Sequence, residues 1–186
     1  MKEFIKTARE LAYSEVERTG MPLKQHIDLS CEKAKQLANE LGANVDIVEA
    51  STLLMDSVIG TAIQEGRISE HVNMCLEKAN ELLEQSELDD KTKENIRYCV
   101  SEHHGVDKFY SLESEICCNA DCFRFASTKG FFYTVRFLRD MPIDDFIKLL
   151  RNKFDEKKNA LTLDTCKQEL KDELVIIDEF ISKLEK

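Results

Sequence analysis

The chain of 186 residues is 42% hydrophobic and 33% charged, which excludes a disordered polypeptide and is typical of a folded globular protein. Its 36 acidic and 26 basic residues give a formal net charge of −10, which opposes binding to nucleic acid and to anionic lipid. With only 6 Gly and 2 Pro, the chain lacks the many turns that a β-sandwich or barrel requires, so the composition favours an all-α fold.

Apolar residues recur at helical spacing along almost the whole chain. The segments predicted to be helical are 4–16, 27–41, 45–58, one that begins at His71, one that begins at Asp90, 112–127, 131–140, and two long helices between Ile143 and Lys186. Residues 60–66 and 103–112 are predicted to be loops, and the two long helices are expected to separate near 161–164. Because the composition does not shift along the chain, we expect one compact multi-helix domain over residues 1–186.

Cysteine usage and hydropathy indicate the compartment. No apolar run approaches the ~20 residues of a membrane span, and the first residues lead into no signal-peptide core. We therefore expect a cytoplasmic protein with no membrane partner. The cysteines are odd in number, lack zinc-ribbon spacing and are expected to be reduced and structural; they are Cys31, Cys75, Cys99, Cys117, Cys118, Cys122 and Cys166.

The histidines are the first candidates for chemistry. All four of them, His26, His71, His103 and His104, lie at or near a predicted helix end, where side chains from different helices can converge on one cleft. One such histidine alone would be interpreted as a capping or surface residue. Four in such places favour a shared site.

Two aspartates lie among apolar residues. Asp56 follows Leu53, Leu54 and Met55, and Asp121 lies within the segment ICCNADCFRFA. A carboxylate in such a helix turn is costly unless it is hydrogen-bonded, paired with a charge or bound to a cation. A local cap or ion pair explains either one alone, whereas imidazoles and carboxylates together suit a divalent metal ion.

Five segments, in this order, resemble the motifs of the HD-domain superfamily of metal-dependent phosphohydrolases. They are HIDLSCEKAKQLA from His26, ASTLLMD ending at Asp56, HVNMCLEKANELL from His71, IRYCVSEHH ending at His104, and NADCFRFAS around Asp121. The resemblance covers about residues 20–130, and residues 131–186 resemble the closing helices of small members of that superfamily.

The resemblance implies an HD-like helical fold, a divalent metal ion (Mn, Mg, Fe, Co, Ni or Zn) and hydrolysis of a small phosphorylated substrate, nucleotide-like in chemistry. It implies His26, Asp56 and Asp121 as metal ligands and Asp56, His71 and His103 as catalytic residues. The histidines His71, His103 and His104 are implied as ligands of a second metal ion or of the phosphate, with one of the last two facing the cleft. The sequence leaves the identity and number of ions and the oligomeric state open.

One position departs from the motif, because Met55 stands where the superfamily has the histidine of its His-Asp pair. A thioether is a poor ligand for these ions, so either the remaining ligands and water hold the ion or the site loses it. The alternative to a phosphohydrolase is therefore a degenerate HD-like module that binds a phosphate ligand or nucleotide without turnover. Four basic residues near the motifs are expected to lie on the solvated surface and are not included in the site; they are Lys24, Arg67, Lys108 and Arg124.

Overall fold

Helices account for all the regular secondary structure in the computed structural model, which describes residues 1–139 and 141–186. The all-α prediction is confirmed for these residues. The helices are α1 (Lys2–Thr19), α2 (Lys24–Leu41), α3 (Val45–Leu54), α4 (Ile59–Gln64), α5 (His71–Glu84), α6 (Asp90–Ser101), α7 (Leu112–Ala126), α8 (Thr128–Tyr133), α9 (Ile143–Ala160) and α10 (Asp164–Leu184), with 3₁₀ turns at Ile68–Glu70 and Thr134–Arg139. Within the described part of the chain, no helix is long and apolar enough to cross a membrane.

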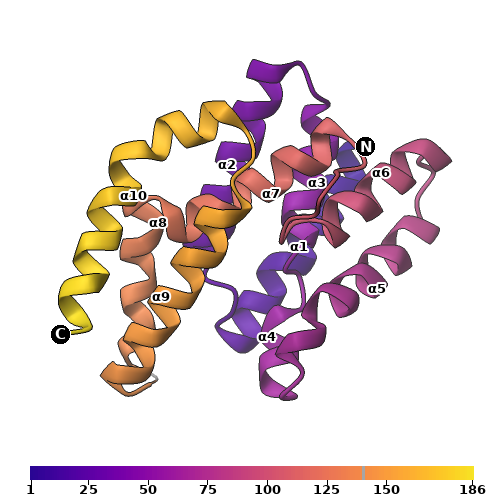
Figure 1. The fold of residues 1–186 in the computed structure, drawn as a ribbon. Coiled ribbons are helices and arrows are strands. Elements are labelled where there is room, and N and C mark those ends of the chain that lie inside the picture. Colours follow the sequence, from indigo (N-terminus) through magenta and orange to yellow (C-terminus); the bar gives the residue numbers. More distant parts are fainter. Residues whose placement is uncertain (140) are drawn as a thin grey trace.

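Helix α7 occupies the middle of the fold, with α5 and α6 on one side and α8, α9 and α10 on the other (Figure 1). It contacts α2, α3, α6, α8, α9 and α10. Small side chains let these neighbours approach closely, since Ala120, Cys117, Cys118 and Cys122 are all fully buried. Polar groups on α7 are consequently enclosed by several helices, and this is where Asp121 lies.

The apolar residues form two clusters. The larger one joins α1, α2, α3, α5, α6 and α7, with Leu161, Cys166 and Leu170 added from the α9–α10 region. The smaller one lies between α8, α9 and α10 and includes Phe131, Phe154 and Ile177. All seven cysteines are buried and free of disulfides, as predicted. Their burial is that of small apolar side chains.

Helix ends place the candidate site residues. The Asn44 side chain accepts hydrogen bonds from two backbone amides at the start of α3, and the helix ends at Leu54, so Asp56 lies in the turn that follows. His71 is the first residue of α5, as predicted. Helix α6 ends at Ser101, which leaves His103 and His104 in the next turn, before Gly105 with its positive φ of 95°.

Three predicted boundaries differ from the structure. Residues 60–66, predicted as a loop, contain α4, because Gly60 permits a close approach to α1; a Cβ at Gly60 would lie 2.7 Å from Thr19 Cβ. The helix predicted over 45–58 ends at Leu54. The helix predicted over 131–140 consists of α8 and a 3₁₀ turn, and its last residue, Asp140, lies outside the described residues.

Gly130 provides a test of this packing. A Cβ at this position would lie 2.6 Å from the Arg124 carbonyl oxygen, a backbone atom of α7 that cannot rotate away. We expect Gly130→Ala to lower the free energy of unfolding by ~1–3 kcal/mol, as overpacking does elsewhere. Urea denaturation measures the change, with Lys129→Ala, an exposed neighbour on α8, as the control. Equal stability of the two variants would contradict the close approach.

Candidate metal centre

Asp56 is the acidic residue at the centre of the candidate site. Its side chain is 8% exposed, and its two oxygens face different partners. Oδ2 accepts a hydrogen bond from Arg124 Nη1. Oδ1 lies 3.7 Å from His71 Nε2 and 3.7 Å from His103 Nε2, and it is buried without a hydrogen-bond partner. One oxygen of this carboxylate is therefore paired, and the other is left facing imidazoles.

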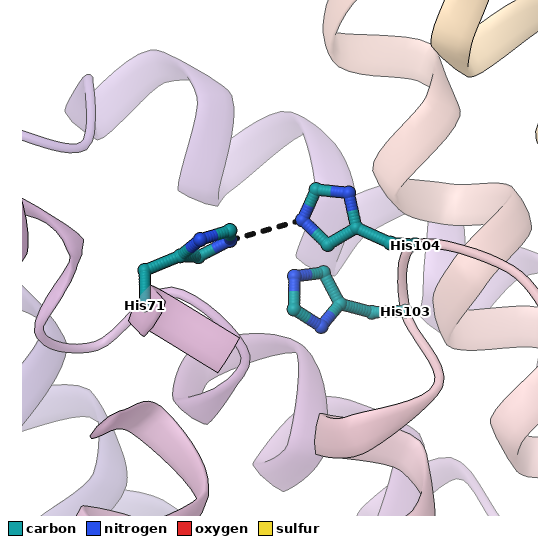
Figure 2. A group of neighbouring side chains, drawn as sticks. All are labelled: His71, His103 and His104. Atoms are coloured by element: carbon teal, nitrogen blue, oxygen red, sulfur yellow. Dashed lines mark hydrogen bonds between the residues drawn. The ribbon is translucent and has the colours of Figure 1, made fainter. Parts of the chain in front are cut away.

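Three histidines from two segments meet close to this oxygen. His71, His103 and His104 each offer a ring nitrogen, and the three nitrogens lie within 4.8 Å of one another. Figure 2 shows His71, at the start of α5, pointing toward the two rings on the turn after α6. His71 Nε2 and His104 Nε2 are 3.0 Å apart. His103 Nε2 is buried without a partner. The structure thus brings all three of these predicted residues together. The expectation that only one of His103 and His104 faces the cleft is wrong, because both lie in a turn after α6 and not on a helix.

Hydrogen bonds to the far side of the rings fix the tautomers. His71 Nδ1 lies 2.7 Å from the Ile68 carbonyl oxygen, and His103 Nδ1 lies 2.6 Å from the Val100 carbonyl oxygen. A carbonyl oxygen only accepts hydrogen bonds, so both Nδ1 atoms carry a proton and donate it. In the neutral rings, the proton-free nitrogen is therefore Nε2, the atom that faces the cluster.

His104 has the same arrangement with a carboxylate. Its Nδ1 lies 2.7 Å from Glu156 Oε1 and donates to it. Lys157 Nζ is 3.2 Å from the same Nδ1, but a nitrogen that donates to a carboxylate has no lone pair for a second donor. The ammonium hydrogen-bonds instead to Asp121 and Glu156. Burial, the largest influence, lowers the pKa of His104, which favours the neutral ring.

Three proton-free nitrogens that face one another repel unless a positive species lies between them. A proton would connect His71 to His104 and would leave His103 Nε2 and Asp56 Oδ1 without partners. A divalent ion would satisfy all four atoms. Donors ~2.1 Å from an ion are ~3.0–3.4 Å apart in octahedral or tetrahedral sites, close to the 3.0 and 3.7 Å measured here. The residues present therefore fit a divalent ion.

Asp121 is paired with two cations rather than with the histidines. Its Oδ1 lies 3.0 Å from Arg124 Nη1, and its Oδ2 lies 2.6 Å from Lys157 Nζ. Burial opposes ionisation of Asp121, but Lys157 and then Arg124 outweigh it and lower its pKa to about 2. At Asp56, burial likewise raises the pKa, but the Arg124 guanidinium outweighs it and holds the pKa well below its ordinary value. Both carboxylates are ionised at neutral pH.

His26 does not join this cluster. It lies in the first turn of α2, and its Nε2 donates a hydrogen bond to the Gly130 carbonyl oxygen, 3.0 Å away. Burial lowers its pKa to about 4, so the ring is neutral. A protonated Nε2 offers no lone pair to a metal ion. The set implied by the resemblance, His26 with Asp56 and Asp121, is not among the groups of three ligands found in the described residues.

Two site residues escaped the sequence analysis. Arg124, expected on the surface, has a side chain that is 4% exposed and pairs with both aspartates. Its position three residues after Asp121 on one helix was the available signal. Lys157 is also buried, and its signal was helical spacing, because it continues the inward-facing stripe of Leu150 and Phe154. Lys24, Arg67 and Lys108 are exposed, as predicted.

Solvent reaches the cluster from the side of two histidines. His104 is 29% exposed and His71 12%, whereas His103 is fully buried. Met55, which precedes Asp56, is also fully buried and fills core space. A surface cavity of about 620 Å³ lies elsewhere, between α5 and α6, and none of the candidate site residues lines it. The candidate site is therefore defined by the positions of its side chains and not by this cavity.

Comparison with solved structures concerns the fold. No sequence-family profile matches this chain, and no curated protein matches it in sequence. A crystal structure of a predicted HD superfamily hydrolase from an uncultured Thermotogales bacterium superimposes with a TM-score of 0.67 at 15% identity, over 98% of this chain and 90% of that one. The fold is HD-like. A Lactobacillus plantarum protein superimposes with a TM-score of 0.65 at 16% identity, over 100% of this chain and 96% of that one. At these identities the likeness shows the fold alone.

The buried neutral His26 predicts a pH dependence of stability. Its pKa is about 4 in the folded protein and 6.5 when unperturbed, so the unfolded chain binds the extra proton between these values. Stability is therefore complete above pH 6.5 and declines as the pH falls toward 4, by ~2 kcal/mol between pH 7 and 5. Urea denaturation with a chelator present measures the decline. His26→Gln, which retains an N–H donor for Gly130, should remove this part of it; an unchanged slope would contradict the neutral assignment.

Proposed function

We propose that this protein is a metal-dependent phosphohydrolase that acts on a nucleotide or another small phosphoester. The observation that supports the proposal most directly is the position of two proton-free Nε2 atoms, from His71 and His103, beside the unpaired Asp56 Oδ1, with His104 Nε2 next to His71 Nε2. Each ring donates its Nδ1 proton to an oxygen, the arrangement that orients histidine ligands at metal centres. Imidazole-rich donor sets favour Fe, Co, Ni or Zn over Mg and Mn.

The charges around the cluster support an anionic substrate once an ion is bound. Three carboxylates (Asp56, Asp121 and Glu156) are paired with three cations (Arg124, Lys153 and Lys157), so the side chains are balanced. A divalent ion would add two positive charges to this neutral group. The site would then attract a phosphate in spite of the overall charge of −10, because local charge at short range outweighs distant screened charge.

The residues of such a site have different roles. When bound, a divalent ion lowers the pKa of a coordinated water and polarises a phosphoryl oxygen. His71, His103, His104 and Asp56 would hold the ion, and Glu156 keeps the His104 ring oriented. Arg124 keeps Asp56 ionised and its Oδ1 turned toward the histidines. The substrate would enter from the side of His71 and His104, the more exposed members of the cluster.

A second function, a module that binds a phosphate ligand without turnover, is favoured by one observation. Asp121 is fully paired with Arg124 and Lys157, and His26 donates to a backbone carbonyl, so the ligand set implied by the resemblance is not assembled. The charge balance argues against this function in the absence of an ion, because a neutral cluster has little attraction for phosphate. The phosphohydrolase and the binding module are distinguished by whether the bound phosphoester is hydrolysed.

Metal content tests the ligand set. Protein purified without chelators, or reconstituted with Co²⁺, should contain one ion per chain. His104→Ala should weaken binding by ~10–100-fold or more, since it removes a ligand and not just a supporting contact. His104 is 29% exposed, so this variant is expected to fold. His26→Gln, a matched change at a histidine outside the cluster, should keep the ion. Loss of the ion in His26→Gln with retention in His104→Ala would support the set His26, Asp56 and Asp121 instead.

Turnover tests the activity. Nucleotides and phosphomonoesters should be hydrolysed in the presence of Mn²⁺, Co²⁺, Fe²⁺, Ni²⁺ or Zn²⁺, and a chelator should abolish the rate. His71→Ala should lower kcat/KM by at least ~10–100-fold, following the loss of the ion. Lys24→Ala, at an exposed position on α2, serves as the control. Tight binding of a nucleotide with no hydrolysis under any of these ions would instead favour the binding module.

A further inference from the structure

Two buried cations occupy the space between Asp56 and Asp121. Arg124 Nη1 donates to Asp56 Oδ2 and also lies 3.0 Å from Asp121 Oδ1, so one guanidinium nitrogen bridges the two carboxylates. Lys157 Nζ lies 2.6 Å from Asp121 Oδ2. Of the four oxygens of these two side chains, only Asp56 Oδ1 is left for another cation, and it faces the histidines.

The positions of these cations are fixed by three helices. Arg124 lies on α7 and donates from Nε to Ser30 Oγ of α2, 2.7 Å away. Lys157 lies on α9 and also contacts Glu156 at 2.8 Å. The side chains of Arg124 and Lys157 are 4% and 3% exposed, so each carries a full positive charge that is shielded from water. A buried charge that loses its partner is strongly destabilising, so neither cation can move away freely.

Arg124 and Lys157 also determine what a metal ion would meet at Asp121. A metal ion that approached Asp121 would meet a carboxylate with both oxygens paired, next to two fixed positive charges. Repulsion between a divalent ion and these charges is large in a site with little water.

We infer that Arg124 and Lys157 are built-in cations that take the place of a metal ion between Asp56 and Asp121 and limit the centre to a single ion at the histidine cluster. The inference rests on the proposed function for that single ion, but the exclusion of an ion from Asp121 is independent of it. In this arrangement the two oxygens of Asp56 have different partners. Oδ2 binds the Arg124 guanidinium, and Oδ1 is the one oxygen of Asp56 and Asp121 that remains for the ion at the histidines.

The experiment counts Co²⁺ ions by calorimetric titration and elemental analysis of the full chain. The wild type is expected to bind one equivalent. Arg124→Met removes the charge and retains an unbranched side chain, so Asp56 Oδ2 and Asp121 Oδ1 lose their bridge. This variant should bind a second equivalent and should gain thermal stability from Co²⁺ beyond the gain of the wild type. Arg124→Lys, which keeps a positive charge, should bind one equivalent.

Two further variants secure the outcome. Lys157→Met tests the same inference if Arg124→Met does not fold, and Arg124→Met combined with Asp121→Asn should lose the second equivalent. Two equivalents on the wild type, loss of the wild-type ion on Asp121→Asn, or no extra Co²⁺ on either methionine variant would overturn the inference. A wild type that binds no Co²⁺ while Arg124→Met binds one would refute the proposed metal function and uphold the role of Arg124.

Discussion

The structure of the candidate site depends on the ion-pair network of Asp56, Asp121, Arg124 and Lys157. These four groups lie on α7, on α9 and in the turn after α3, and each is nearly inaccessible to water. Removing any one of them would leave an uncompensated buried charge, a change that costs ~3–5 kcal/mol in comparable networks. The network therefore acts on the relative positions of three chain segments as well as on local charge, and it determines which way Asp56 faces.

This constraint passes to the histidine cluster through a single carboxylate. Because Arg124 holds Oδ2, Oδ1 of Asp56 is turned toward His71 and His103 and remains unpaired. The rings are oriented independently, by acceptors on their Nδ1 atoms. Two separate sets of contacts thus bring metal-binding atoms close together, and among the described residues no positive group lies between these atoms. Unpaired buried acceptors are rare in folded proteins, and a site that brings together two of them, Asp56 Oδ1 and His103 Nε2, fits the proposed cation.

Much of this arrangement was predictable from the sequence, and the failures have a common cause. Helical spacing located the helices, and helix ends placed His71, His103 and His104 where they could meet. Helical spacing does not determine which hydrogen-bond or ion-pair partner a buried polar side chain has in the folded protein. His26 begins the first of the five motif-like segments, yet its Nε2 donates to the Gly130 carbonyl oxygen, which is 104 residues away along the chain. Such a choice depends on how closely α8 approaches α2, and no local pattern encodes it.

Two residues next to Asp56 bear on its capacity to bind a metal ion. The resemblance to the superfamily motif implies that Met55 stands in place of a neutral imidazole ligand, and Arg124 places a fixed positive charge against the other oxygen of the carboxylate. A missing neutral ligand weakens a site without changing its charge, whereas a built-in cation removes the electrostatic need for an ion there. Arg124 therefore has the larger effect on the attraction of this part of the site for a metal ion. With the guanidinium in place, an imidazole at position 55 would lie next to a pair of aspartates whose charge is already neutralised. This charge balance is the physical reason why a methionine is compatible with position 55.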